Sequence, residues 1–159
     1  MKNLILICSC FGPGYTVNPD CENLMTNMAR TIKEKFPRNT FHLISSSNPK
    51  AQKSADYVSK VLEVPISHTS DIFWAKPEDD PHGGKNRREL LEAFKKELLA
   101  NQGDKDFVVL VTNLKYMYVV PWFLTYEWGQ KAPWLNREQG AAIILYFEEE
   151  RFEELYAQR

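Results

Sequence analysis

The sequence of 159 residues lacks a long hydrophobic run and an excess of charge of either sign. No apolar stretch approaches the roughly 18 residues of a membrane-spanning helix, so we expect no membrane partner. Twenty basic and twenty-one acidic side chains give a formal net charge of -1, which excludes a general basic field for nucleic acid. The aliphatic run after Lys2 is shorter than the core of about 7–15 residues in a secretory signal, so we expect no leader.

Cysteine is also scarce, with Cys8, Cys10 and Cys21 making an odd number. A chain of this length can form a hydrophobic core without a disulfide framework. We therefore expect three buried, free thiols and a cytoplasmic protein. No second close pair of cysteines or histidines accompanies Cys8 and Cys10, so the spacing predicts no metal site.

Short apolar runs alternate with longer amphipathic segments, and no repeat or linker divides the chain. Residues 65–85 hold three prolines and two adjacent glycines, and are predicted to be mostly loop. The periodicity predicts strands at 3–9, 40–46, 107–112 and 141–147, and helices at 19–36, 48–62, 86–98, after the third strand, and at 148–158.

This order of elements predicts one α/β domain over residues 1–159. We expect a three-layer αβα sandwich, in which helices cover both faces of a mostly parallel central sheet. Proteins of this class bind ligands at the carboxyl ends of their parallel strands. Three loops, 8–18, 45–50 and 112–115, should therefore converge at one edge of the sheet.

Segment 45–55, Ser-Ser-Ser-Asn-Pro-Lys-Ala-Gln-Lys-Ser-Ala, resembles the Ser-Ser-Pro-Leu-x-Arg-Ala-x-Gln-Thr-Ala segment of the histidine phosphatase (phosphoglycerate mutase-like) superfamily. The first strand ends in Cys-Ser-Cys where that family has Arg-His-Gly. Residues 108–113 resemble its late strand ending in a second His, and 140–144 resemble the start of its last strand. The resemblance covers nearly the whole chain and implies the phosphoglycerate mutase-like fold, in the short branch that includes phosphohistidine phosphatases.

In that family one His carries the phosphoryl group, while two Arg and a second His neutralise the phosphate oxygens. The resemblance aligns Cys8 with the first Arg, Ser9 with the nucleophilic His, Lys50 with the second Arg and Asn113 with the second His. Only Lys50 keeps a positive charge. We expect an inactive member, without a cofactor, whose remnant pocket at Ser9, Asn18, Lys50 and Asn113 binds a phosphorylated small molecule or anion, or serves a regulatory role.

The general acid of this family often lies in the long loop, and several residues here could approach the pocket. The sequence does not decide between them. His42 lies inside a predicted strand instead, where a structural role is expected. The loop candidates are His68, Asp71, Glu78, Asp79, Asp80 and His82.

Two other functions stay open. A phosphatase with non-standard catalytic residues would use Cys8 or Cys10 as its nucleophile. Cysteine-dependent phosphatases, however, have an arginine six residues after the cysteine, where this chain has Gly14 and Thr16. Segment 8–18 also resembles the phosphate loop of flavodoxin-like FMN-binding proteins, in which backbone N–H groups at a helix N-terminus hold the phosphate.

Seven aromatic residues fall within the nineteen residues of segment 116–134. A helix buries only one of its faces, and this one is aromatic nearly all round. Tyrosine and tryptophan are enriched in protein interfaces. The segment is therefore a candidate interface for a homo-oligomer, and the alternative is a helix packed on the sheet.

Overall fold

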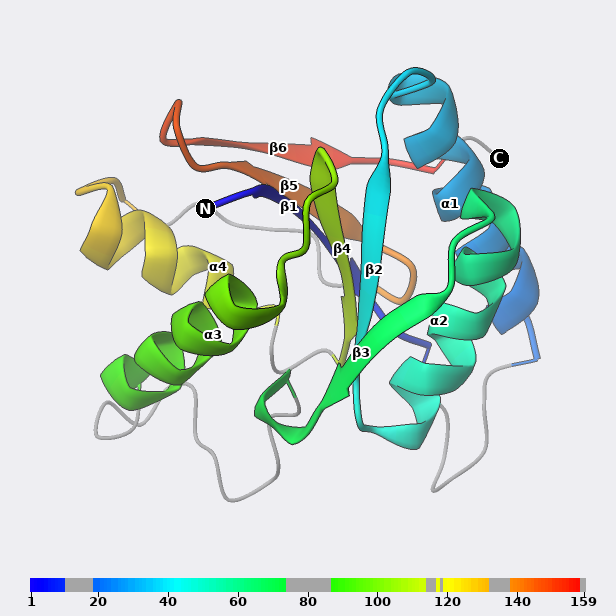
Figure 1. Cartoon of the computed structure of the whole chain (residues 1–159), viewed down its shortest axis with the longest axis horizontal. Coiled ribbons are helices and arrows are strands. Elements are labelled where there is room, and N and C mark those ends of the chain that lie inside the picture. Colours follow the sequence, from blue (N-terminus) through cyan, green and yellow to red (C-terminus); the bar gives the residue numbers. More distant parts are fainter. Residues whose placement is uncertain (11–18, 74–86, 114–116, 118, 132–137, 158–159) are drawn as a thin grey trace.

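The computed structural model describes residues 1–10, 19–73, 87–113, 117, 119–131 and 138–157. A six-stranded sheet forms its centre, with the strand order β3-β2-β4-β1-β5-β6. Helices α1 and α2 cover one face of this sheet, while α3 and α4 cover the other (Figure 1). The expected three-layer α/β sandwich is confirmed.

The strands are short and the helices span up to four turns. The strands are β1 (Asn3–Cys8), β2 (Phe41–Ser46), β3 (Ile66–Ser70), β4 (Phe107–Thr112), β5 (Ala142–Tyr146) and β6 (Arg151–Leu155). The helices are α1 (Cys21–Lys35), α2 (Pro49–Leu62), α3 (Arg87–Asn101), α4 (Val119–Trp122), the 3₁₀ turn η1 (Asp71–Phe73) and the π-helical turn η3 (Phe123–Glu127).

The first four strands in this order, β3, β2, β4 and β1, run parallel to one another. The parallel pairs are β1 with β4, β4 with β2, and β2 with β3. Strand β5 is antiparallel to β1, and β6 is antiparallel to β5. The register places Cys8 opposite Thr112 and Ser45 opposite Val111, so β1, β2 and β4 end at the same edge. The antiparallel β5 begins at that edge, because Ala142 lies opposite Ile7.

Strand β1 divides its side chains between two hydrophobic cores, as the period of two in a strand requires. Leu4 and Leu6 pack in the core under α3 and α4. Ile5 and Ile7 pack in the core under α1 and α2. Burial on both faces explains why β1 and β4 are nearly continuous in aliphatic residues.

Helix α2 begins as its sequence predicts. The side chain of Asn48 accepts a hydrogen bond from the N–H of Lys50 at 2.9 Å, and Pro49 takes the first helical position. Helix α1 begins two residues later than expected, at Cys21, after a turn that contains Pro19. Asn18, which we expect from the sequence in the remnant pocket, lies outside the described residues.

Two predictions of secondary structure were wrong. Strand β3 occupies 66–70, where we expected loop, because its backbone pairs with β2 although its short polar side chains give little hydrophobic signal. Strand β6 occupies 151–155, where we expected an acidic helix. The spacing of Phe152 and Leu155 also suits a helix, and pairing with β5, which the local pattern does not reveal, decides for a strand.

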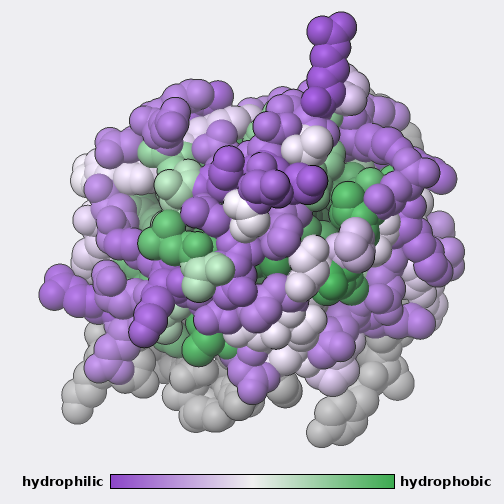
Figure 2. All heavy atoms as spheres, viewed as in Figure 1, coloured by the Kyte–Doolittle hydropathy of each residue, from purple (hydrophilic) through white to green (hydrophobic). Residues whose placement is uncertain are grey.

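The face drawn in Figure 2 is largely hydrophilic, with small apolar areas between charged side chains. Large hydrophobic side chains that are exposed include Ile72, Leu99, Tyr126 and Tyr156. Within the described part of the chain, no helix combines the length and the apolar character needed to cross a membrane.

Candidate functional site

The described parts of the three predicted loops meet at the edge where β1, β2 and β4 end. Ser9 follows β1, and its N–H donates to the carbonyl oxygen of Thr112, the last residue of β4, at 2.7 Å. Lys50 lies in the first turn of α2, shortly after β2. Asn113 follows Thr112 directly. The structure therefore brings Ser9, Lys50 and Asn113 to one edge of the sheet.

The main chain at the end of β1 is fixed from both sides. On the side opposite β4, the N–H of Cys8 donates to the oxygen of Ala141 at 2.8 Å, and Gly140 donates to the oxygen of Cys8 at 2.9 Å. Gly140 adopts a φ of +76°, and a Cβ there would lie 3.3 Å from the Cβ of Leu24. A glycine is therefore needed where this segment passes between β1 and α1.

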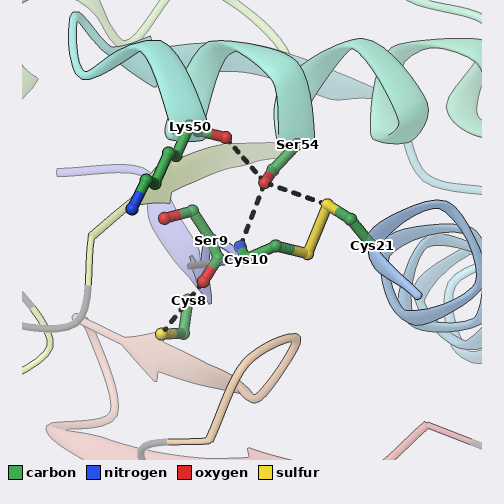
Figure 3. The surroundings of a disulfide bond; sticks show 6 residues. All are labelled: Cys8, Ser9, Cys10, Cys21, Lys50 and Ser54. Carbon is green, nitrogen blue, oxygen red and sulfur yellow. Dashed lines mark hydrogen bonds between the residues drawn. A yellow bond between two sulfur atoms is a disulfide. The ribbon is translucent and has the colours of Figure 1, made fainter. Parts of the chain in front are cut away.

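Polar groups gather around the first turn of α2. The hydroxyl of Ser46 accepts a hydrogen bond from the N–H of Asn48 at 3.2 Å, so the chain turns tightly from β2 into the helix. In Figure 3 the side chains of Lys50 and Ser9 extend to the same side, away from the disulfide. A helix N-terminus carries a partial positive charge. This arrangement suits an anion more than a cation.

Two polar residues, Thr112 and Asn113, lie at the end of strand β4. The hydroxyl of Thr112 donates to the carbonyl oxygen of Phe73 at 2.5 Å and lies 3.4 Å from the side-chain oxygen of Asn113. Thr112 is fully buried, whereas Asn113 is half-buried. The contact ties the end of β4 to η1, the turn that follows β3.

Among the candidate acids, Asp71 lies at this edge. It accepts a short hydrogen bond from the hydroxyl of Ser47, which follows β2. His68 instead bonds Glu97 of α3 at 2.8 Å, and this hydrogen bond lowers the pKa of the Glu97 carboxyl. The other loop candidates, Glu78, Asp79, Asp80 and His82, lie outside the described residues.

His42 lies near the amino end of β2, at the edge of the sheet opposite the site. A Cβ built on Gly103 would approach its Nδ1 to 2.8 Å, so the ring packs closely against that glycine. The structural role expected for His42 agrees with this position.

The expectation of three free thiols was wrong, because Cys10 and Cys21 form a disulfide with a Cα–Cα distance of 5.6 Å. The sequence alone does not indicate that Cys10 and Cys21 lie close together in space. Cys8 is buried outside this disulfide, and burial raises its pKa to about 12. At neutral pH Cys8 is therefore a neutral thiol, and its Sγ donates to the oxygen of Ser9 at 3.6 Å.

Sequence reasoning missed Ser54, a fully buried residue of α2 at the centre of these contacts (Figure 3). Its hydroxyl accepts the N–H of Cys10 at 3.1 Å, donates to the oxygen of Lys50 at 2.8 Å and lies 3.6 Å from the Sγ of Cys21. Its position on the buried face of α2, between Ala51 and Ala55, was the available signal.

No group of three or more histidine, cysteine or acidic side chains is placed to hold a metal ion in the ranges that the structure describes. A cavity of about 330 Å³ opens on the α1 side of the same edge. Its lining includes Leu24, Asn27, Gly140 and Tyr156. Most of the segment proposed as an FMN phosphate loop, residues 11–18, lies outside the described residues.

Comparisons with known proteins bear on the fold. No protein-family model and no curated protein matches the chain. Among solved structures, mycobacterial glucosyl-3-phosphoglycerate phosphatase in complex with VO3 aligns over 100% of both chains, with a TM-score of 0.63 and 12% identity. The putative phosphohistidine phosphatase SixA from Agrobacterium tumefaciens aligns over 99% of both chains, with a TM-score of 0.67 and 10% identity.

A third similar structure is the protein histidine phosphatase SixA complexed with tungstate. The alignment covers 98% of this chain and 95% of that one, with a TM-score of 0.62 and 14% identity. The chain thus has the fold of the histidine phosphatases. This confirms, at the level of the fold, the resemblance drawn from segments 45–55 and 108–113.

Proposed function

We propose that this chain uses the histidine phosphatase fold to bind a phosphorylated small molecule or a simple anion, as a regulatory module without phosphoryl transfer. The binding groups are Ser9, Lys50 and Asn113, with Asn18 as a further group expected from the sequence. The observation that carries the proposal is that a buried serine, and no histidine, occupies the position that the sequence resemblance aligns with the family's nucleophile. This serine, Ser9, is 1% exposed beside a thiol that burial keeps protonated.

The loss of catalysis rests on what phosphoryl transfer requires. A serine hydroxyl attacks phosphorus only if a base removes its proton, and a histidine most often takes that part. The two histidines of the described residues lie elsewhere, His42 beside Gly103 and His68 on Glu97. Each missing preorganised donor costs about 10²–10³ in rate.

A cysteine nucleophile is disfavoured for a separate reason. The reactive form of cysteine is the thiolate. Cys10 is bound to Cys21, and the thiol of Cys8 has a pKa of about 12. Neither sulfur is therefore available as a thiolate at neutral pH.

Binding of an anion needs less than catalysis does. Lys50 supplies a positive charge, and the N-terminus of α2 adds the partial charge of its backbone N–H groups. Ser9 and Asn113 add neutral hydrogen-bond donors. A site with one cation should bind weakly, and we propose that it works in the cytoplasm, where phosphorylated metabolites are abundant.

The test is isothermal calorimetry with inorganic phosphate, a phosphorylated sugar and a nucleotide. We expect binding that Lys50→Gln weakens about tenfold, in line with a charge-assisted hydrogen bond. Lys60→Gln, on the exposed surface of the same helix, is the matched control and should bind as the wild type does. An absence of heat at millimolar ligand would reject the binding site.

The absence of catalysis has its own assay, the hydrolysis of p-nitrophenyl phosphate. We expect no turnover above the rate in buffer. Turnover at enzyme-like rates that Ser9→Ala or Cys8→Ala abolishes would reject the proposal and identify the nucleophile. A yellow colour of the purified protein would instead favour the flavodoxin-like alternative.

A further inference from the structure

The three cysteines lie within fourteen residues of the sequence, and two of them, Cys10 and Cys21, are paired in the fold. Cys8 faces the core under α3 and α4. Cys10 and Cys21 face the opposite core, under α1 and α2, where they are bonded. The sheet therefore separates Cys8 from the disulfide, and its high pKa further protects the disulfide from attack by this thiol. Exchange of the Cys10–Cys21 disulfide with Cys8 is therefore disfavoured.

This disulfide lies beside the candidate binding site, on the side away from the Ser9 and Lys50 side chains (Figure 3). Cys10 follows Ser9 directly, and its N–H is held at 3.1 Å by the hydroxyl of Ser54. The same hydroxyl donates to the carbonyl oxygen of Lys50 at 2.8 Å and lies 3.6 Å from the Sγ of Cys21. The cross-link thus ties Cys10 to the first residue of α1, while the Ser54 hydroxyl holds the Cys10 N–H against α2. Together these two contacts fix the position of Ser9 relative to Lys50.

We propose that Cys10 and Cys21 are a reversible redox site whose oxidation state sets the affinity of the neighbouring pocket for anions, an inference that rests on the proposed function. With the disulfide closed, Ser9 and Lys50 are held in place before the ligand arrives. With it open, the same ligand must first fix Ser9 and Cys10 against α2, and its affinity falls. Oxidation therefore strengthens anion binding and reduction weakens it.

The redox step needs an external dithiol, either a small molecule or a dithiol protein. Its thiolate attacks one sulfur of the pair, so that a mixed disulfide forms and the other cysteine leaves as a thiol after gaining a proton. The second thiol of the reductant then closes its own disulfide and releases the remaining cysteine. In total, two electrons and two protons move from the reductant to Cys10 and Cys21.

Both oxidation states suit the surroundings of the pair. Cys10 and Cys21 are buried among apolar side chains that include Met25, Ala51 and Ala55. Neutral thiols are small hydrophobic groups that pack well in such a core. The Ser54 hydroxyl already lies beside one sulfur and can keep a hydrogen bond to it after reduction. In the cytoplasm, disulfides of this kind usually serve redox sensing.

The experiment compares oxidised and reduced wild-type protein in titrations with inorganic phosphate. We expect reduction to weaken binding about tenfold, within the usual range of coupling between two sites. The double variant Cys10→Ser/Cys21→Ser should bind as the reduced protein does, and dithiothreitol should leave its affinity unchanged. Coupling between two equilibria is reciprocal, so saturating phosphate should shift the thiol–disulfide equilibrium of the wild type with dithiothreitol about tenfold toward the disulfide.

The outcomes separate this inference from the function on which it rests. Equal phosphate affinity in both states, with a thiol–disulfide equilibrium that phosphate does not shift, rejects redox control and leaves anion binding in place. An absence of phosphate binding in both states rejects the proposed function and the redox control together. Amide NMR spectra check the fold, and a reduced chain that has unfolded would show that the disulfide is a staple of the fold, which overturns the inference.

Discussion

Cys8 and Cys10 lie two residues apart, yet their side chains lie on opposite faces of the central sheet. Residues two apart on a regular strand share a face. The chain therefore leaves the regular period of the strand after Cys8, at the point where Ser9 bonds Thr112 of β4. This irregularity gives the two cysteines different chemistry, a buried thiol on one face and a disulfide on the other.

Thiol counting tests this assignment. Denaturation without reductant should expose one reactive thiol per chain, and denaturation after reduction should expose three. In the native protein Cys8 should react slowly with iodoacetamide at pH 8, because a pKa of about 12 leaves about one thiol in 10⁴ as thiolate. Rapid labelling of Cys8 in the native state would contradict its burial.

The disulfide should also stabilise the fold. Cys10 and Cys21 lie 11 positions apart in the sequence. Closing a loop of this size lowers the entropy of the unfolded chain and so raises the free energy of unfolding by about 3 kcal/mol. Reduction of the wild type should lower the free energy of urea unfolding by about this amount. Dithiothreitol should leave the variant Cys10→Ser/Cys21→Ser unchanged, and equal stability of oxidised and reduced wild type would count against the cross-link.

The disulfide shows which features the sequence could predict and which it could not. Nearly continuous runs of aliphatic residues identified β1 and β4, and the Asn48-Pro49 pair placed the start of α2. These signals are local. Strands β3 and β6 and the disulfide depend on contacts between distant segments, and a local pattern does not contain them.

The same distinction applies to the candidate site. The parallel order of strands predicted that Ser9, Lys50 and Asn113 would meet at one edge, because carboxyl ends of parallel strands lie together. The role of Ser54 was missed, since its place on the buried face of α2 does not reveal its contacts with Cys10 and Cys21, which are distant in the sequence. The place of Asp71 beside Ser47 likewise follows from the pairing of β3 with β2.

The aromatic segment 116–134 is our proposed interface between copies of the chain. Much of its described part is core, since Trp122 is 5% exposed and the ring of Phe123 packs edge-on against Phe94 at 5.3 Å. Trp122→Ala should therefore lower stability by about 3–5 kcal/mol. Tyr126 is 51% exposed, so Tyr126→Ser should keep the stability and weaken self-association.

Sedimentation velocity over a concentration series measures this association, and chemical denaturation measures the stability of the same variants. A wild-type chain that stays monomeric at high concentration would reject the proposed interface.

Glu153 should make part of the stability depend on pH. Its Oε1 lies 2.6 Å from the Lys35 ammonium, and the Tyr146 hydroxyl donates to its Oε2 at 3.2 Å. The hydrogen bond from Lys35 is the main cause that lowers the pKa of Glu153 in the fold. A lowered carboxyl pKa contributes stability above the unfolded value of about 4.3, and this contribution is lost as pH falls through the folded value.

Glu153→Gln should therefore cost at most about 1 kcal/mol at pH 7, because a third of this side chain is exposed and water screens the ion pair. The cost should vanish below the folded pKa, where the wild-type carboxyl is protonated as well. Urea unfolding at several pH values measures both. Glu34→Gln, at an exposed position of α1, is the control, and a pH-independent cost of Glu153→Gln would contradict the ion pair.

A comparison of Gly103 with Gly129 distinguishes the backbone strain of adding a side chain from the steric clash that the side chain makes. Both adopt a positive φ, +66° and +63°, which alanine reaches at a cost of about 1–2 kcal/mol. A Cβ on Gly129 meets no atom within 4 Å, whereas one on Gly103 would approach Nδ1 of His42 to 2.8 Å. Gly103→Ala should therefore destabilise the protein more than Gly129→Ala does.

The difference between the two glycine variants isolates the clash with His42. If the ring causes it, adding His42→Ala to Gly103→Ala should recover that difference and leave the backbone cost in place. Urea unfolding of the single and double variants gives the coupling between the two positions. Strictly additive losses would show that the ring of His42 moves aside freely, and that its packing against Gly103 does not hold the amino end of β2.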